Sequence, residues 1–272
     1  MGKWAKRLFS KPSFGSVGIV LAGTNTPAFE KEVLGFFDEV ISSKDSVYHA
    51  HLVRKGKVCY PLVLNVYGAS AMVDVLTEMH DGGCRNVIFI GYAYGGFRNL
   101  PIGSIVLADI SYHFEGIYAS VDPSRKIASP DLILQKKIEK LFLQHKISYT
   151  HGVNISVPAV TLQPAHANKE YLRIKPTTIE MELSSCYSRS RDIGMRVAGI
   201  LIISDNRNKS IADVGSEKIR YQAKMHVLKI IIKNLSSFHL TPLEVKKKFM
   251  VDKHLASIIA DPYDMTNVYK KK

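Results

Sequence analysis

Gly199-Ile200-Leu201-Ile202-Ile203-Ser204-Asp205-Asn206 is a compact apolar run that ends in an acid and an amide. Its length and its β-branched residues predict a buried strand of an α/β sheet. Ligands of open α/β sheets bind just outside the carboxyl ends of the strands. We therefore expect Asp205 at the rim of a ligand cleft.

A second acidic stretch, Ile179-Glu180-Met181-Glu182, lies about twenty residues earlier. We predict a helix over residues 177–191, with Thr177 as its N-cap and Glu180 three residues later, as in a capping box. Glu182 would then lie near the start of this helix, so that Glu182 and Asp205 can face one ligand. Each acid also has a plainer interpretation, because acids are favoured in first helical turns and in turns that end strands.

The rest of the chain alternates between the two element types. We predict strands over residues 17–23, 48–53, 58–66, 87–91, 101–108 and 197–203, an extended segment over 150–160, and helices after Pro27 and over 68–81, 131–144 and 211–236. This order predicts an α/β fold, a three-layer αβα sandwich. The glycine turn near Gly56 makes one strand pair a hairpin, so the central sheet is expected to be mixed.

The domain division follows the distribution of charge. We predict a basic N-terminal extension over residues 1–14, the α/β domain over 15–238, and a basic helical C-terminal extension over 239–272. The chain has a net charge of +13, which favours anionic partners. Much of the excess lies at the two ends and fits a solvated lysine-rich surface. No nucleic-acid motif accompanies the charge, so nucleic acid is not expected as a partner.

The cysteines and the apolar runs bear on the cellular setting. Cys59, Cys84 and Cys186 lack CxxC spacing, so neither a zinc site nor a disulfide framework is predicted, and no metal is expected. The first apolar run, residues 17–22, is shorter than a secretory signal or a membrane span requires. We expect a reduced, cytoplasmic protein that does not associate with a membrane.

Three stretches resemble sequence blocks of the purine nucleoside phosphorylase and uridine phosphorylase family. Residues 86–106 resemble its strand, glycine loop and strand; residues 179–185 resemble its Met-Glu helix; and residues 201–206 resemble its Ser-Asp strand end. The order and spacing of the blocks match over about residues 17–236. The resemblance implies a nucleoside phosphorylase/hydrolase-like fold and a homo-oligomer, trimeric or hexameric.

The resemblance also implies a reaction. Such enzymes cleave the N-glycosidic bond of a purine or pyrimidine nucleoside in nucleoside salvage, with inorganic phosphate as co-substrate and no cofactor. By resemblance, Glu182 grips the ribose hydroxyls, Met181 packs on the sugar, and Asp205 protonates the departing base. Apolar surroundings at a strand end could raise the pKa of Asp205 enough for that role.

The remaining site residues come from the resemblance as well. Lys218 stands where the family places a basic partner of the acid, although exposed helix lysines are common. Tyr67 matches a sugar contact, and Ile155 and Ser156 match the segment that lines the base pocket. We expect the phosphate-site loops at Gly23, Gly91 and Tyr92.

The expected phosphate site departs from the family pattern. The loop after Gly23 carries no Arg, Phe89 stands where the family has another Arg, and Tyr92 replaces a Ser or Thr. A phosphate dianion requires donors and positive charge, which Phe89 cannot supply. A further family Arg, given by a neighbouring subunit, has no counterpart in residues 45–51, which hold His49 and His51.

Hydrolytic relatives place a Glu in the first glycine loop, and no acid lies between Gly23 and Ala28; Glu30 is the nearest. Three functions therefore remain open: a phosphorylase, a hydrolytic nucleosidase, and a non-catalytic nucleoside- or nucleotide-binding protein. The sequence does not choose between purine and pyrimidine.

Overall fold

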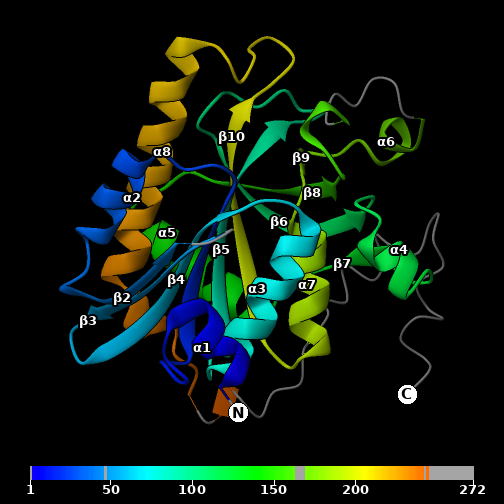
Figure 1. The fold of residues 1–272 in the computed structure, drawn as a ribbon. Helices are drawn as coiled ribbons and strands as arrows, with labels where there is room; N and C mark the ends of the chain where they lie inside the picture. Colours follow the sequence, from blue (N-terminus) through cyan, green and yellow to red (C-terminus); the bar gives the residue numbers. More distant parts are fainter. Residues whose placement is uncertain (1, 46–47, 163–168, 242, 245–272) are drawn as a thin grey trace.

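The computed structural model describes residues 2–45, 48–162, 169–241 and 243–244. In this part of the chain one mixed sheet of ten strands forms the centre of the fold (Figure 1). Its strands are β1 (Val17–Ala22), β2 (Glu39–Asp45), β3 (His49–Lys55), β4 (Val58–Val66), β5 (Asn86–Gly95), β6 (Ile105–His113), β7 (Ile127–Ala128), β8 (Thr150–Ser156), β9 (Thr178–Glu180) and β10 (Arg196–Asp205).

Four neighbouring strands set the direction of the sheet. β4, β1, β5 and β10 pair in parallel in that order, so their carboxyl ends meet at one edge. β2, β3 and β4 continue as an antiparallel meander. On the other side β10 pairs with β6, β6 with β8, β8 with β9, and β9 with β5. These five strands therefore close on themselves, and the closure places β9 next to the carboxyl end of β5.

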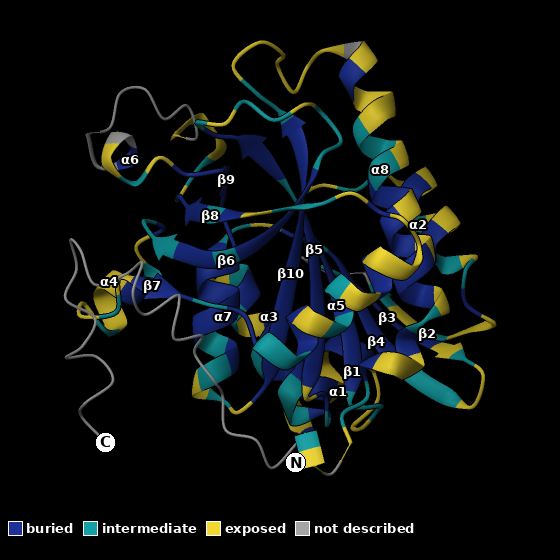
Figure 2. Cartoon of the chain, turned by 180° about the vertical axis from the view of Figure 1, so that it is seen from behind, coloured by how far each residue is buried: buried dark blue, intermediate teal, exposed yellow. Residues whose placement is uncertain are grey.

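Helices cover both faces of the sheet, as Figures 1 and 2 show. One core cluster joins the sheet to α2 (Pro27–Leu34), α5 (Leu132–Gln144) and α8 (Val214–Lys233). A second cluster joins the opposite face to α1 (Lys3–Phe9), α3 (Ala69–Asp81) and α7 (Leu183–Asp192). The expected three-layer sandwich with a mixed sheet is confirmed. Shorter elements are α4 (Ile117–Val121), α6 (Lys169–Ile174), and the 3₁₀ turns η1 (Val160–Leu162) and η3 (Leu235–Phe238).

The first residues of the chain pack on the fold. Asp81, at the end of α3, accepts hydrogen bonds from the backbone N–H groups of Gly2 and Trp4 at 2.9 and 2.7 Å, and Arg7 pairs with Glu78. The division into two extensions and a domain stays a prediction. Of the predicted C-terminal extension, residues 242 and 245–272 lie outside the described residues.

Several predicted elements differ from the structure. β5 continues to Gly95 instead of giving way to a loop at Tyr92, because it pairs with β10 and β9 along that length. The strand expected from residue 101 begins at Ile105, and β2 was not predicted. The expected helix over 177–191 is wrong at its start: Thr177 precedes strand β9, and α7 begins only at Leu183.

The described residues contain neither a candidate membrane-spanning helix nor a candidate metal-binding cluster. None of the helices there combines the length and the apolar character that crossing a bilayer requires. Nor do three or more His, Cys, Asp or Glu side chains in these segments gather in a way that could hold a metal ion.

Candidate functional site

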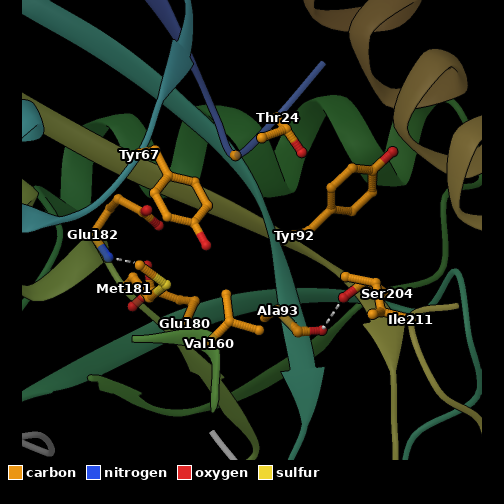
Figure 3. Close-up of a pocket in the computed structure, with 11 residues that line it drawn as sticks. Thr24, Tyr67, Tyr92, Ala93, Val160, Glu180, Met181, Glu182, Ser204 and Ile211 are labelled. Atoms are coloured by element: carbon orange, nitrogen blue, oxygen red, sulfur yellow. Dashed lines mark hydrogen bonds between the residues drawn. The ribbon is translucent and has the colours of Figure 1, made fainter. Parts of the chain in front are cut away.

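A cavity of about 390 Å³ opens at the carboxyl ends of the parallel strands. This volume is in the range of sites that bind small organic molecules. The walls come from η1, from the segments that follow β1, β4 and β10, and from the ends of β5, β9 and β10. The lining residues are Gly23, Thr24, Tyr67, Tyr92, Ala93, Val160, Glu180, Met181, Glu182, Ser204 and Ile211 (Figure 3).

Glu182 forms part of one wall and is 5 % exposed. It occupies the N-cap position of α7, and its Oε1 accepts a hydrogen bond from the backbone N–H of Gly68 at 2.6 Å. Gly68 precedes α3 and has φ 85°, a conformation that favours glycine. The carboxylate is thus fixed between the starts of α3 and α7. A carboxylate accepts several hydrogen bonds, so it keeps capacity for ligand hydroxyls.

Glu180 lies beside Glu182 and organises the start of α7. Its Oε2 accepts the backbone N–H groups of Glu182 and Leu183, each at 2.7 Å. Its Oε1 accepts Ser156 Oγ at 2.5 Å and Asn154 Nδ2 at 2.7 Å. The acid therefore caps the helix that follows it, which is the reverse of the predicted capping box, because the β9 strand turns into α7 between the two acids.

The two carboxylates are buried together, and this affects their protonation. Burial, and then the negative charge of Glu180, raise the pKa of Glu182 to about 8, while the Gly68 N–H acts in the opposite direction. Burial also raises the pKa of Glu180, against the donors from Ser156 and Asn154. The pair can hold a proton near neutral pH.

Asp205 ends β10 and is not among the lining residues, but its neighbour Ser204 lines the cavity on the side opposite the two acids (Figure 3). The Oγ of Ser204 lies 3.2 Å from the carbonyl oxygen of Ala93 (Figure 3). The same Oγ lies 2.5 Å from Asp205 Oδ1. Burial raises the pKa of Asp205, and the hydrogen bond from Ser204 and the positive charge of Arg220 lower it in part. The carboxyl itself is half-buried next to the lining residues.

The predicted basic partner, Lys218, lies exposed on α8 and is not among the lining residues. Arg220, two residues later, is the cation that acts electrostatically on both Asp205 and Tyr92. One helical turn further, Lys224 is fully buried. Sequence reasoning missed both residues. A signal for Lys224 existed, because it follows Tyr221 by three residues and precedes Leu228 by four, inside an apolar helical stripe.

The other predicted residues fall into two groups. Met181 and Tyr67 line the cavity, and the Tyr67 ring points into it although the residue is 50 % exposed (Figure 3). Ile155 and Ser156 lie behind the wall: Ile155 packs in a small cluster with Met181, and Ser156 supports Glu180. A base-pocket role for these two stays a prediction.

Two of the three residues predicted in the phosphate-site loops line the cavity. Gly23 and Tyr92 line it, whereas Gly91 lies beneath. Phe89 is fully buried in the core cluster on the α3 side, and its ring would come within 2.9 Å of a Cβ atom added at Gly91. The aromatic ring thus fills the space below the strand end, and it brings no charge to the cavity.

Glu30, His49 and His51 form a separate cluster between α2 and β3. Glu30 Oε2 lies 2.5 Å from His49 Nδ1, and Glu30 Oε1 lies 3.0 Å from His51 Nε2. Glu30 is thus engaged with two imidazoles and does not line the cavity. The nearest acid to the first glycine loop is therefore not placed to activate a water there.

Comparison with known proteins places this geometry in a family. The model of the phosphorylase superfamily matches residues 25–234. Similar solved structures include a purine nucleoside phosphorylase from Toxoplasma gondii in complex with immucillin-H, with 15 % identity, coverage of 81 % of this chain and 90 % of that chain, and a TM-score of 0.68. A search of curated protein sequences gave no match.

Two further structures differ in the reactions that their names state. Uridine phosphorylase from Vibrio fischeri has 19 % identity, coverage of 81 % and 93 %, and a TM-score of 0.67. The 5′-methylthioadenosine/S-adenosyl homocysteine nucleosidase of Campylobacter jejuni has 13 % identity, coverage of 80 % and 98 %, and a TM-score of 0.66. Phosphorylases and nucleosidases thus share this fold. The match of the family model over most of the chain, together with the fold, shows that the protein belongs to the phosphorylase superfamily.

Proposed function

We propose that the protein cleaves the N-glycosidic bond of a nucleoside in this cavity, with phosphate as the acceptor of the pentosyl group. The observation that carries the proposal is the buried carboxylate of Glu182, which is fixed by Gly68 and lies beside Met181 in the cavity wall. An ionised, desolvated carboxylate binds vicinal sugar hydroxyls strongly. A thioether next to it offers an apolar surface to the sugar ring.

The chemistry needs help at the departing base as well. When the bond between C1′ and the base nitrogen breaks, its electron pair goes to the base, and the sugar approaches an oxocarbenium ion. A phosphate oxygen then forms the new bond at C1′. Asp205, whose burial raises its pKa, supplies a proton or hydrogen bond to the base. Ser204, which precedes Asp205, lines the cavity across from Glu182, and this separation supports a nucleoside that lies between the two ends (Figure 3).

Hydrolysis is the second candidate. It is favoured by one observation: Phe89, in the place of a family arginine, is a buried core residue without charge. In hydrolysis a water oxygen takes the place of the phosphate oxygen at C1′. A binding protein without turnover is the third possibility, and it shares the same lining residues.

The test is release of free base from a panel of purine and pyrimidine nucleosides, with and without inorganic phosphate. We expect phosphate-dependent release, and a decrease in kcat/KM of about 100-fold for Glu182→Gln, the loss expected for a charged hydrogen bond. Glu39→Gln, at the exposed edge strand β2, is the matched control. Equal release without phosphate would favour the nucleosidase, and binding without release would favour the binding protein.

We also propose that the chain forms a homo-oligomer. Three large apolar side chains that line the cavity, Tyr67, Val160 and Ile211, are also exposed, at 50, 37 and 47 %. A second copy could cover this apolar rim. Light scattering of the purified protein tests the proposal, and a monomeric mass at micromolar concentration would contradict it.

A further inference from the structure

Lys224 is a buried cation with few partners. Its side chain is fully buried, and its Nζ donates a hydrogen bond to Asn25 Oδ1 at 2.7 Å. Among the described residues, no carboxylate oxygen lies within ion-pair distance of this ammonium. Its other neighbours are aromatic faces: the Nζ lies 4.3 Å from the ring centroid of Tyr92 and 4.9 Å from that of Phe29. An ammonium has three donors, and burial without full pairing is costly.

Lys224 adjoins the end of the cavity that faces away from the two acids. Asn25 follows Gly23 and Thr24, which line the cavity, and Tyr92 lines it as well. In Figure 3, Thr24 and Tyr92 stand across the cavity from Glu182. The cavity therefore has an acidic wall on one side. The buried ammonium of Lys224 lies behind the opposite wall.

The segment between the cation and the cavity is held by hydrogen bonds. The backbone N–H and the Nδ2 of Asn25 both donate to Asn65 Oδ1, at 2.8 and 3.1 Å. The Nδ2 also donates to the carbonyl oxygen of Gly23 at 3.1 Å, and the N–H of Gly23 donates to Val66 at 2.8 Å. The side-chain amide of Asn25 thus presents its oxygen to Lys224, and the hydrogen bonds that Asn25 donates to Asn65 and Gly23 fix the orientation of this amide.

We infer that Lys224 is the positive charge for a phosphate group bound at Gly23, Thr24 and Tyr92. This inference rests on the proposed function and assigns to the phosphate site a buried cation in addition to the partly exposed Arg220. A buried charge acts on a neighbouring anion through a medium of low polarity, where the attraction is stronger than in water. Lys224 does not line the cavity and acts through Asn25 and Tyr92, so it is a positioning residue.

The protonation of Lys224 agrees with this geometry. Burial lowers its pKa to about 7, and the negative charge of Glu182 opposes the decrease. An anion on the near side of the loop would hold the proton on the amine. The phosphate group can come from inorganic phosphate or from a nucleoside 5′-monophosphate, and the chemistry at Lys224 would be the same for both.

The experiment compares Lys224→Met with Lys233→Met, which removes an exposed lysine from the end of the same helix. Binding of inorganic phosphate, and separately of uridine and inosine 5′-monophosphates, is measured by calorimetry at pH 6.5. We expect Lys224→Met to weaken binding of one of these anions at least tenfold, with nucleoside affinity within twofold of the unaltered protein. We expect Lys224→Arg to retain part of the anion affinity.

Thermal unfolding separates this role from a structural one. Because methionine replaces a poorly paired buried charge with an apolar chain of similar length, Lys224→Met is expected to raise the Tm in the absence of phosphate. A lowered Tm with unchanged anion affinity would overturn the inference and make Lys224 structural. Equal anion binding by the Lys224→Met and Lys233→Met variants would also overturn it, as would the absence of anion binding by the unaltered protein.

Failure of this inference can be distinguished from failure of the proposed function. Phosphate-independent cleavage of nucleosides with no anion binding would refute the inference and leave nucleoside cleavage standing. Anion binding that depends on Lys224, with no nucleoside bound or cleaved, would support the inference and refute the proposed function.

Discussion

Glu180 Oε2 accepts the backbone N–H of Glu182 at 2.7 Å, so two buried acids adjoin at the start of one helix. Glu180 is satisfied by four protein donors, whereas the carboxylate of Glu182 accepts backbone hydrogen bonds from Gly68 and Met181. The first acid therefore has a structural role, and the second is available to a ligand. The sequence predicted a capping role for Glu180 and a sugar contact for Glu182, but it did not predict that Glu180 caps the helix that follows it from the end of β9.

Stability should depend on pH through Glu182. The folded protein retains the Glu182 proton up to about pH 8, whereas the ordinary value is 4.5. Between these values the folded state binds the extra proton, so the free energy of unfolding decreases as pH rises from about 4.5 to about 8. Urea unfolding at pH 5, 6.5 and 8 measures this slope. Glu182→Gln should reduce it, and an unchanged slope in that variant would contradict the assignment.

In the range below about pH 8, activity should rise with pH, whereas stability decreases. The ionised form of Glu182 accepts the sugar hydroxyls, so kcat/KM should rise toward pH 8. Lys224 loses its proton near pH 7, which should reduce phosphate use at higher pH. We expect a bell-shaped profile with its maximum between these two values. A rate that is constant from pH 6 to 9 would show that neither group controls the reaction.

Arg220 and Lys218 can be distinguished by substitution. Arg220 acts on Asp205 electrostatically, whereas Lys218 is exposed. We expect Arg220→Met to lower kcat about tenfold and to move the pH dependence assigned to Asp205 upward, because a positive charge favours the ionised acid. Lys218→Met should change kcat and the pH dependence assigned to Asp205 less than Arg220→Met does. A larger effect at Lys218 would restore the family-based assignment.

Ser156 should affect stability through Glu180. Ser156 Oγ donates to Glu180 Oε1 and accepts the backbone N–H of Ser184 at 2.9 Å, and all three residues are buried. Ser156→Ala leaves these partners short of one hydrogen bond each, which should cost about 1–3 kcal/mol in the free energy of unfolding. Ser120→Ala, on exposed α4, should change it by less than about 0.5 kcal/mol. Equal effects in the two variants would show that Ser156 is dispensable to the start of α7.

Long, strongly patterned segments of the fold were predictable from the sequence. The runs that form β1, β4 and β10 are apolar over six residues or more, and the helix α5 has a clear amphipathic repeat with Asp131 as its N-cap. β9 is only three residues long and has no period of its own, so its pairing with β5 and β8 decides its structure. Tertiary pairing overrides local preference in such segments.

The candidate site was predictable where it lies on the family blocks. Glu182, Met181 and Tyr92 follow directly from those blocks and line the cavity. Lys224 could not be predicted from those blocks, because its position in the site depends on the packing of α8 against the loop after β1. This packing brings together residues about 200 positions apart. A lysine on a helix is usually interpreted as a solvent contact. Its place in an apolar stripe is the signal that contradicts this interpretation.

Phe89 limits which single substitutions the site can accept. The ring is fully buried and occupies the space beside Gly91, in contact with the core on the α3 side. A single Phe89→Arg change would therefore put an unpaired guanidinium into an apolar interior, at a cost of several kcal/mol. It would not rebuild an arginine-based anion site unless neighbouring core residues changed with it. Anion specificity at this strand end can therefore be redesigned only by coordinated changes in the core behind it, and not by a single substitution in the cavity wall.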